Sequence, residues 1–293
     1  MNILITGATG PVGNDLLRFL SKNNTIYSFY RNKKNKITNI KNVNWIKTNS
    51  LDTYVFPKNL NIQCVIHCAV DQKYLKLDKK KYLNLNLKII KNLINNFKKL
   101  KKDKIFINLS SIEVYGHIKK KILYENYKPF QQNPYGLMKY KCEKILKKSN
   151  INYVNLRLPG VLCKFSKKLK NRPWINLISH KLKKNEDVQI YNSKSKFNNL
   201  ISTDELKKII IKILKSKAVI KKNFNVGSSK PLNLKMIINM MKKKLGSKSL
   251  IIESETKKIS FLISIQKIEK FLNYKISSTR SMIKKHLSYL QAS

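Results

Sequence analysis

The segment NPYGLMKYK, residues 133–141, places Tyr135 and Lys139 four positions apart. On an α-helix two such side chains lie one turn apart on the same face. A phenol is a poor base near neutral pH because its ordinary pKa is about 10, but a lysine ammonium beside it lowers that pKa and enables proton transfer. Spacing alone does not identify a catalytic pair, because six of the 14 tyrosines begin a Tyr-x-x-x-Lys pair: Tyr30, Tyr54, Tyr115, Tyr124, Tyr135 and Tyr140.

A second group of residues suited to chemistry lies at the amino terminus, in NILITGATGPVG, residues 2–13. The apolar run predicts a β-strand that ends in a turn containing Gly7, Gly10 and Gly13, and LLRFL then predicts a helix. Spaced glycines permit a tight turn and a close approach of the backbone to a pyrophosphate, and the helix start offers free N–H groups. The motif therefore predicts a dinucleotide-binding turn.

The end of the second predicted strand, SFYRNKK, bears on the choice between the two nicotinamide dinucleotides. An Asp or Glu at this point binds the ribose 2′-hydroxyl of NAD, whereas an Arg accommodates the 2′-phosphate of NADP. This sequence has Tyr30 and Arg31 there and no carboxylate. The missing carboxylate favours NADP(H), and NAD(H) is left open.

Short β-rich runs alternate with helix-like segments through the first half of the chain. In one such segment, 80–99, apolar residues recur every three or four positions, which indicates one face of a helix. Alternating strands and helices are typical of a parallel sheet with helices on both faces, and right-handed crossovers favour the Rossmann order. We therefore predict an α/β fold with a Rossmann-type doubly wound parallel sheet. The predicted strands are 2–6, 25–30, 64–69, 104–110 and 153–158, and the predicted helices are 11–22, 80–99 and 134–148.

Beyond Pro159 the alternation of strands and helices weakens. This part predicts a helix at 174–184, strands near 188–191 and 199–202, a helix at 203–215, a strand at 223–226 and two closing helices. We therefore predict an NAD(P)-binding Rossmann domain over residues 1–158. A smaller C-terminal substrate-binding lobe takes residues 159–293, with some of its segments returning to the Rossmann sheet.

The chain of 293 residues carries a formal net charge of +47. Such a charge is typical of proteins that bind nucleic acid or anionic membranes. Here the excess is lysine, spread from end to end beside abundant Asn and Ile, and these three residues have A/T-rich codons, so a mutational bias of the genome explains it. Only five arginines are available for the forked contacts that nucleic-acid sites use. We therefore expect no nucleic-acid partner, although the charge favours anionic ligands.

Other sequence features bear on the cellular compartment of the protein and on metal binding. No apolar run approaches the roughly 18 residues that cross a bilayer, and the amino terminus lacks the basic region of a signal peptide. The four cysteines show no framework spacing and indicate reduced thiols. The four histidines form no metal cluster with cysteines or acids, so we expect no metal. Together these observations predict a cytoplasmic protein without a membrane span.

In order and spacing, the motifs resemble those of one family along the full length of the chain. TGATGPVG is similar to the family's TGxxGxxG, VIHCA to its V-I-H-x-A strand, SSIEVYG to its active-site strand end and NPYGLMK to its catalytic helix. LRLPGV and FNVGSSKPLNL resemble later motifs, and Asp204 matches the Asp of V-x-D. On these residues the chain is identified as a member of the extended short-chain dehydrogenases/reductases. This NAD(P)-dependent epimerase/dehydratase group acts mostly on nucleotide-activated sugars.

The resemblance implies a catalytic site of Ser111, Tyr135 and Lys139, because only this one of the six pairs follows the Ser-bearing strand and begins a helix after Asn-Pro. In the family the tyrosine exchanges a proton with a substrate oxygen, the lysine also holds the nicotinamide ribose, and the serine hydrogen-bonds the same oxygen. Relatives often pair through a four-helix interface, which segments 80–99 and 134–148 would supply in a homodimer. The cofactor-binding residues that the resemblance implies are Gly7, Thr9, Gly10, Val12, Gly13, Arg31, Asp52, Ala69, Asn86, Tyr135, Lys139 and Pro159.

Two departures from the family pattern concern the substrate. Glu113 stands where the family's 4,6-dehydratases and decarboxylases carry an acid, but Ile112 replaces the Asp that precedes it in dehydratases of the dTDP-glucose kind. Glu113 is therefore compatible with a base, a substrate contact or a structural hydrogen bond. Phe197 replaces an Arg that binds the substrate's diphosphate in many relatives. The other candidates for substrate contact are the cations Arg172, Lys194 and Lys196 and the ring of Trp174.

The resemblance and the missing carboxylate after the second strand together predict an oxidoreductase that acts on a nucleotide-activated sugar. The favoured activity is an NADPH-dependent 4-keto-sugar reductase in surface polysaccharide biosynthesis. An NAD-dependent epimerase or 4,6-dehydratase that uses Glu113 is the alternative. A catalytically inactive RNA-binding protein on the same fold is an alternative of another class, and the intact Ser111, Tyr135 and Lys139 argue against it.

Overall fold

The computed structural model divides the chain into two units. The first comprises Met1–His117, Lys128–Arg157 and Ile211–Phe224, and the second comprises Ile118–Tyr127, Leu158–Ile210 and Asn225–Ser293. The assignment of cofactor and substrate to separate domains stays a prediction. The residues that the structure describes are 1–32, 40–57, 60–100, 104–164, 174–216, 220–256 and 259–291.

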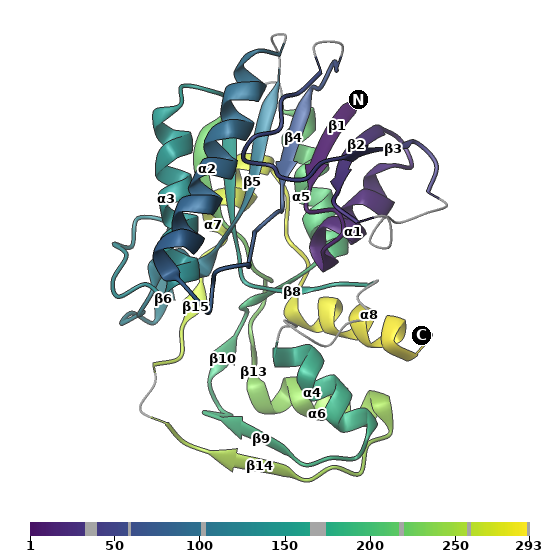
Figure 1. Ribbon diagram of the computed structural model, residues 1–293. Helices are drawn as coiled ribbons and strands as arrows, with labels where there is room; N and C mark the ends of the chain where they lie inside the picture. Colours follow the sequence, from purple (N-terminus) through teal and green to yellow (C-terminus); the bar gives the residue numbers. More distant parts are fainter. Residues whose placement is uncertain are drawn as a thin grey trace. The chain divides into compact units, whose positions relative to one another are not determined.

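A seven-stranded sheet lies at the centre of the first unit (Figure 1). Its strand order is β12-β7-β5-β4-β1-β2-β3, and β1 runs parallel to β2 and β4, β2 to β3, and β4 to β5. The chain thus builds outward from β1 in both directions, as a Rossmann sheet does, and the predicted Rossmann-type doubly wound sheet is confirmed. The strands are β1 (Asn2–Thr6), β2 (Thr25–Tyr30), β3 (Val43–Lys47), β4 (Cys64–His67), β5 (Ile105–Ser111), β7 (Tyr153–Leu158) and β12 (Lys221–Asn225).

Burial along the strands explains which of them the sequence revealed. Every residue of β4, β5 and β7 is buried, because helices cover both faces of a central parallel strand and both faces are therefore apolar. The edge strand β3 has no fully buried residue, so its sequence VNWIK carries neither a continuous apolar run nor a strict alternation. The sequence analysis accordingly missed β3.

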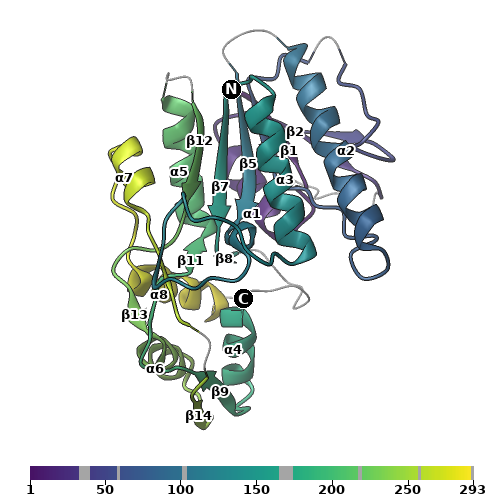
Figure 2. The same ribbon diagram turned by 90° about the vertical axis from the view of Figure 1, so that its left-hand side faces the viewer.

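Three helices surround this sheet: α1 (Pro11–Leu20), α2 (Lys79–Lys98) and α3 (Pro134–Lys148). Figures 1 and 2 show α2 and α3 side by side on one face and α1 on the other. The apolar stripe predicted for α2 faces inward, with Tyr82, Ile89, Leu93 and Phe97 buried. The helix predicted at 11–22 ends at Leu20, and Ser21 is its C-cap, with its backbone N–H donating to the carbonyl oxygen of Leu17.

The second unit is built from short elements. Its four two-stranded sheets pair β8 with β11, β9 with β14, β10 with β13 and β6 with β15. Three helices follow β12 rather than the two predicted, because the seven-residue α7 is too short to show a helical period. The elements of this unit are β6 (Ile122–Leu123), β8 (Gly160–Leu162), α4 (Trp174–Lys183), β9 (Val188–Tyr191), β10 (Lys196–Phe197), β11 (Leu200–Ser202), β13 (Leu232–Asn233), α6 (Leu234–Leu245), β14 (Ile251–Ser254), β15 (Leu262–Ile263), α7 (Gln266–Leu272) and α8 (Thr279–Gln291). Helix α5 (Thr203–Lys215) begins in the second unit and ends in the first, and the 3-10 turn η2 (Ile112–Tyr115) belongs to the first.

None of the described helices combines the length and the apolar composition of a membrane-spanning segment. All four cysteines carry free thiols. Burial raises the pKa of the Cys68 thiol to about 12, although the charge of Lys139 acts in the opposite direction. Burial therefore disfavours the thiolate of Cys68, which is the reactive form of a cysteine.

Candidate active site

The glycine-rich turn between β1 and α1 has no room for side chains. Gly7 has a φ of +72°, and a Cβ on it would lie 2.7 Å from the backbone nitrogen of Ala69. A Cβ on Gly13 would lie 2.3 Å from the carbonyl oxygen of Gly7. Helix α1 begins after Gly10 without a side-chain cap, so its first N–H groups are available to an anion. The turn thus fits the pyrophosphate of a dinucleotide.

Asn86 on α2 holds the segment that follows β4. Its side-chain amide donates to the carbonyl oxygens of Asp71 and Tyr82, and its Oδ1 accepts from the backbone N–H of Asp71, each at 2.9 Å. These three bonds use the full donor capacity of a buried amide. Asn86, predicted to bind the cofactor, therefore acts through the backbone after Ala69.

Arg31 follows β2 and forms an ion pair that the sequence did not reveal. Its Nη1 lies 3.1 Å from Oδ2 of Asp71, which follows β4. The Arg31 side chain is 64% exposed, whereas that of Asp71 is only 13% exposed. A carboxylate thus stands beside the arginine predicted to bind the 2′-phosphate, but it comes from the segment after β4, which β1 separates from β2 in the sheet, and it is paired with the arginine. Asp52, predicted to bind the cofactor, accepts a hydrogen bond from the Ser50 hydroxyl.

Helix α3 places Tyr135 and Lys139 on one face, with the ammonium 5.8 Å from the centre of the ring. Lys144 lies at a similar distance, 5.1 Å, from the ring of Tyr140, so this geometry does not separate the two pairs. Burial separates them. Lys139 is 3% exposed and donates to the carbonyl oxygen of Leu109 at 2.7 Å, whereas Lys144 is exposed to solvent.

Ser110 and Ser111, the last two residues of β5, serve different neighbours. Ser111 is 8% exposed, and its Oγ accepts from the backbone N–H of Glu113 at 3.2 Å, which caps the 3-10 turn η2. Ser110 donates to Oε1 of Glu143 at 2.6 Å. Ser110 therefore joins α3 to the sheet through Glu143, and the assignment of Ser111 as the catalytic serine stays a prediction.

A buried ion pair beneath α3 was missed by the sequence analysis. Arg157 on β7 donates to both carboxylate oxygens of Glu143, from Nη2 at 2.7 Å and from Nε at 3.0 and 3.2 Å, and its Nη1 donates to the hydroxyl of Tyr115 at 2.7 Å. Burial alone would lower the pKa of Arg157, but the hydrogen bonds and charge of Glu143 raise it. The only sequence signal was Glu143 four residues after Lys139, on the same helix face.

Glu113 turns its carboxylate toward the start of α3. Its Oε2 accepts from Nδ2 of Asn133 at 2.7 Å, and Oδ1 of Asn133 accepts from the backbone N–H of Gly136, also at 2.7 Å. Of the three roles left open for Glu113, the structure contains the structural hydrogen bond.

In the second unit, Pro159 is buried between β7 and β8. Trp174 packs edge-on against Phe197, with ring centres 5.1 Å apart, so an aromatic pair stands where many relatives carry an arginine. Arg172 lies outside the described residues. A cavity of about 220 Å³ opens beside Phe197 and is lined by Tyr191, Asn192, Ser195, Lys196, Phe197, Asn199, Leu234, Thr256, Ile259, Ser260 and Phe261.

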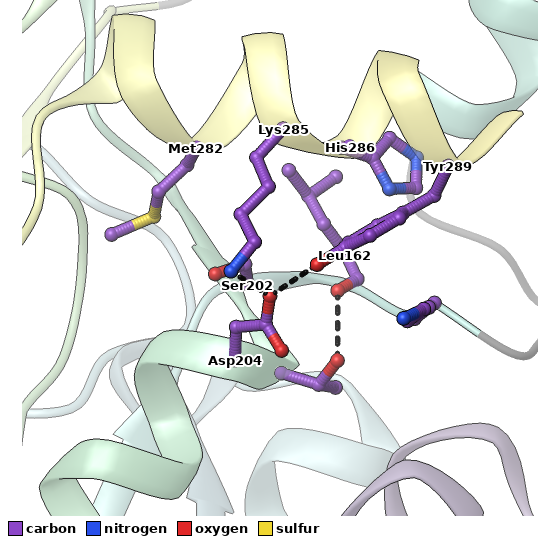
Figure 3. Close-up of a pocket in the computed structure, with 9 residues that line it drawn as sticks. Leu162, Ser202, Asp204, Met282, Lys285, His286 and Tyr289 are labelled. Carbon is purple, nitrogen blue, oxygen red and sulfur yellow. Dashed lines mark hydrogen bonds and ion pairs between the residues drawn. The ribbon is translucent and has the colours of Figure 1, made fainter. Parts of the chain in front are cut away.

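Asp204, matched to the family's V-x-D, ties the start of α5 to α8 (Figure 3). Its Oδ2 accepts from the Tyr289 hydroxyl at 2.7 Å and lies 2.5 Å from Nζ of Lys285. Burial acts to raise the pKa of Asp204, but the hydrogen bonds from Lys285 and Tyr289 outweigh it and lower the pKa. The cavity beside these residues measures only about 10 Å³, so this cluster holds the fold together and leaves no room for a substrate.

A Rossmann sheet whose first turn excludes side chains and faces an open helix start defines the class of dinucleotide-dependent enzymes. Residues 3–227 match the model of the NAD dependent epimerase/dehydratase family. Because this match covers most of the chain, the protein belongs to the NAD dependent epimerase/dehydratase family. It is an enzyme of the extended short-chain dehydrogenase/reductase group, as the sequence motifs predicted.

Known proteins resemble the chain over nearly its full length. CDP-abequose synthase of Salmonella muenchen is 27% identical over 261 residues, which are 85% of this chain and 82% of that protein. The structure of UDP-glucuronic acid 4-epimerase from Bacillus cereus with NAD superimposes with a TM-score of 0.78 at 21% identity, covering 99% of this chain and 96% of that one. The structure of dTDP-glucose 4,6-dehydratase from Bacillus anthracis with NAD superimposes with a TM-score of 0.79 at 15% identity, covering 100% of this chain and 97% of that one. At such identities the structural likeness shows the fold.

Proposed function

We propose that the protein is an NADPH-dependent reductase of a 4-keto sugar carried on a nucleotide. The observation that carries this proposal is Arg31 at the end of β2, where an enzyme that binds NAD has a carboxylate. The largely exposed guanidinium uses one N–H in its ion pair with Asp71, and its other donors can form charge-assisted bonds with a 2′-phosphate. The ion pair with Asp71 restricts the position of the guanidinium at the end of β2.

The cofactor, when bound, supplies the hydride that a carbonyl reduction needs. Its pyrophosphate would lie in the turn of Gly7, Thr9, Gly10, Val12 and Gly13. Lys139 has two further N–H donors beyond its bond to Leu109, and we propose that they hold the hydroxyls of the nicotinamide ribose. Asp52, Ala69 and Pro159 would line the remainder of the cofactor site, with Asn86 fixing the backbone there.

Tyr135 has the role of acid in this proposal. As the C4 carbonyl of the sugar becomes an alcohol, its oxygen takes the proton of the Tyr135 hydroxyl, and the Ser111 hydroxyl donates a hydrogen bond to the same oxygen. The ammonium of Lys139 stabilises the tyrosinate that remains. Such positioned proton transfer contributes about 10²–10⁴-fold to the rate of an enzyme reaction.

For the substrate we propose a CDP-linked 4-keto sugar, and a place for the protein in surface polysaccharide biosynthesis. The relative from Salmonella muenchen, whose name describes the synthesis of a CDP-activated sugar, supports this choice. The cavity beside Phe197 offers amide and hydroxyl groups to a nucleotide and has Lys196 at its wall. Trp174, packed on Phe197, would support a base or sugar ring there.

An NAD-dependent epimerase is the second candidate, and Asp71 is the observation in its favour. Its carboxylate pairs with Arg31 at the end of β2, and in this second candidate it would accept a hydrogen bond from the 2′-hydroxyl of NAD once Arg31 turns outward. Two solved relatives, the 4-epimerase and the 4,6-dehydratase, contain NAD. Binding of the two dinucleotides therefore separates the candidates.

Titration of the purified protein with NADPH and NADH, followed by cofactor fluorescence, tests the proposal. We expect NADPH to bind more tightly, and Arg31→Ala to weaken NADPH by about tenfold or more through the loss of a charge-assisted contact worth about 1.5–3 kcal/mol while leaving NADH within about twofold. Arg280→Ala, an exposed arginine on α8, is the control. Tighter binding of NADH that Asp71→Asn abolishes would overturn the reductase in favour of the epimerase.

A further inference from the structure

The carboxylate of Glu113 contacts the residue that starts the helix of Tyr135 and Lys139. Asn133 is the N-cap of α3, with its Oδ1 accepting from the N–H of Gly136. Because this bond fixes which end of the amide is oxygen, the Nδ2 end must point at Glu113, where it donates to Oε2 at 2.7 Å. The cap and the carboxylate are therefore one continuous hydrogen-bonded unit.

The backbone around this contact is tightly packed. A Cβ on Gly136 would lie 2.0 Å from the carbonyl oxygen of Glu113, so the first turn of α3 rests directly on η2. Gln132 adds a bond from Nε2 to the carbonyl oxygen of Val114 at 2.5 Å. The turn η2 is itself capped by Ser111. Through these contacts the position of Ser111 depends on where α3 begins.

We infer that Glu113 is a positioning residue, which places Tyr135 relative to Ser111 by holding the cap of α3. This inference rests on the proposed function, since it assigns Tyr135 and Ser111 to one reacting oxygen. The carboxylate acts as a hydrogen-bond acceptor, and its basicity is not used. The bond from Asn133 uses one acceptor site of the Glu113 carboxylate, so only variants that keep an acceptor and remove the base can separate the two roles.

Four variants separate an acceptor from a base. Glu113→Gln keeps an oxygen that can accept from Asn133 but removes the basic carboxylate, and Glu113→Ala removes both. Asn133→Asp keeps the helix cap, because Asp caps as well as Asn, but it cannot donate and repels Glu113. The double variant E113Q/N133D restores the contact in reverse, with the glutamine amide donating to the aspartate.

The readouts are NADPH affinity by fluorescence, the melting temperature, and turnover of the proposed CDP-linked 4-keto sugar. We expect E113A and N133D to lose about tenfold or more in kcat with little change in KM, since misplacing a reacting group by about 1 Å costs up to about 10²-fold. E113Q and the double variant should stay within about threefold of the wild type. Rescue by E113Q/N133D would not occur if Glu113 were a base.

Separate outcomes report on the inference and on the proposed function. An active wild type with E113Q as impaired as E113A overturns the positioning role and leaves the reductase standing. A wild type that neither binds NADPH nor reduces the sugar overturns the reductase. The melting temperatures still decide on the contact in that case: E113A and N133D should each lower it by about 2 °C or more, and equal values in all variants would contradict the inference.

Discussion

Tyr135 and Tyr140 are the two tyrosines of α3 that have a lysine one turn further on, and the burial of that lysine distinguishes them. Five residues rotate Tyr140 by about 140° from Tyr135 around the helix, so one helix cannot present both to a single cofactor. Lys139 is buried against the strand end that carries Ser111, while Lys144 is in solvent. A charge excluded from water acts more strongly on its neighbour than an exposed one.

We therefore expect Tyr135→Phe to lower kcat by about 10² or more, because it removes the proton donor. Tyr140→Phe is the matched control and should leave kcat within about twofold. The measurement is NADPH consumption at saturating sugar nucleotide, with folding checked by the melting temperature. Equal losses in the two variants would contradict the assignment of the pair.

His67 at the end of β4 predicts how stability responds to acid. Its Nδ1 lies 2.7 Å from Oγ1 of Thr6, and burial, with a smaller effect of Lys139, lowers the pKa of His67 to about 3. The ordinary value is about 6.5, so as the pH falls the unfolded chain takes up this proton before the folded one. Stability is therefore complete above about pH 6.5 and falls by about 1.4 kcal/mol per pH unit below it.

Urea unfolding at pH 7 and pH 5 measures this effect. The wild type should lose about 2 kcal/mol more between these values than His67→Gln does. His117→Gln, at an exposed position, should behave like the wild type. A wild-type loss no greater than that of His67→Gln would mean that His67 is protonated in the folded protein.

At the scale of elements, α3 can pack closely on η2 only because residue 136 is a glycine. A Cβ on Gly136 would clash with the backbone of Glu113, and backbone cannot give way as a side-chain tip can. Gly136→Ala should lower the free energy of unfolding by about 2 kcal/mol through overpacking and reduce kcat as α3 shifts. Gly246→Ala is the control, because its Cβ would meet nothing within 4 Å and only backbone strain of about 1 kcal/mol remains. Denaturant titration and turnover of both variants check this.

The elements that the sequence predicted well are those whose signal is local. Buried strands such as β4 and β5 appear as apolar runs, and α3 begins where Asn-Pro supplies a cap and a first helical residue. The edge strand β3 and the short α7 lack such local signals. The contacts of Glu143 with Arg157 and Ser110 join residues far apart in sequence, and no local sequence pattern around Glu143 identifies these two residues as its partners. The role of Glu113 stayed open for the same reason.

At the scale of the whole molecule, lysine defines the surface of α2 and α3. The sequence of α2 contains no acid, and the one acid of α3, Glu143, is buried. A symmetric dimer through these helices, which the family resemblance implies, would place like charges opposite each other, and salt would screen them. The exposed lysines on the sides of α2 and α3 that would meet in such a dimer include Lys80, Lys88, Lys91 and Lys98 on α2 and Lys141, Lys144 and Lys148 on α3.

We therefore expect the protein, at about 10 µM, to be a monomer in 50 mM NaCl. The fraction of dimer should rise in 500 mM NaCl, because the Debye length is then only about 4–5 Å and the lysines repel each other less. Sedimentation velocity at both salt concentrations measures it. Lys88→Glu with Lys91→Glu should promote association at low salt, and Lys244→Glu on α6 is the control. A stable dimer at 50 mM NaCl would contradict the prediction that repulsion between the lysines of α2 and α3 prevents association at low salt.

Arginine is rare in this chain, and one of its arginines is buried. Only five of the 62 basic residues here are arginine. Arg157 bonds Glu143 and Tyr115 with one rigid fork, and the single ammonium of a lysine could not meet both. Replacing either Arg157 or Glu143 by a neutral residue would leave the other as an unpaired charge in the core. Arg157 and Glu143 are therefore a pair in which neither residue can be replaced by itself without leaving a buried charge unpaired.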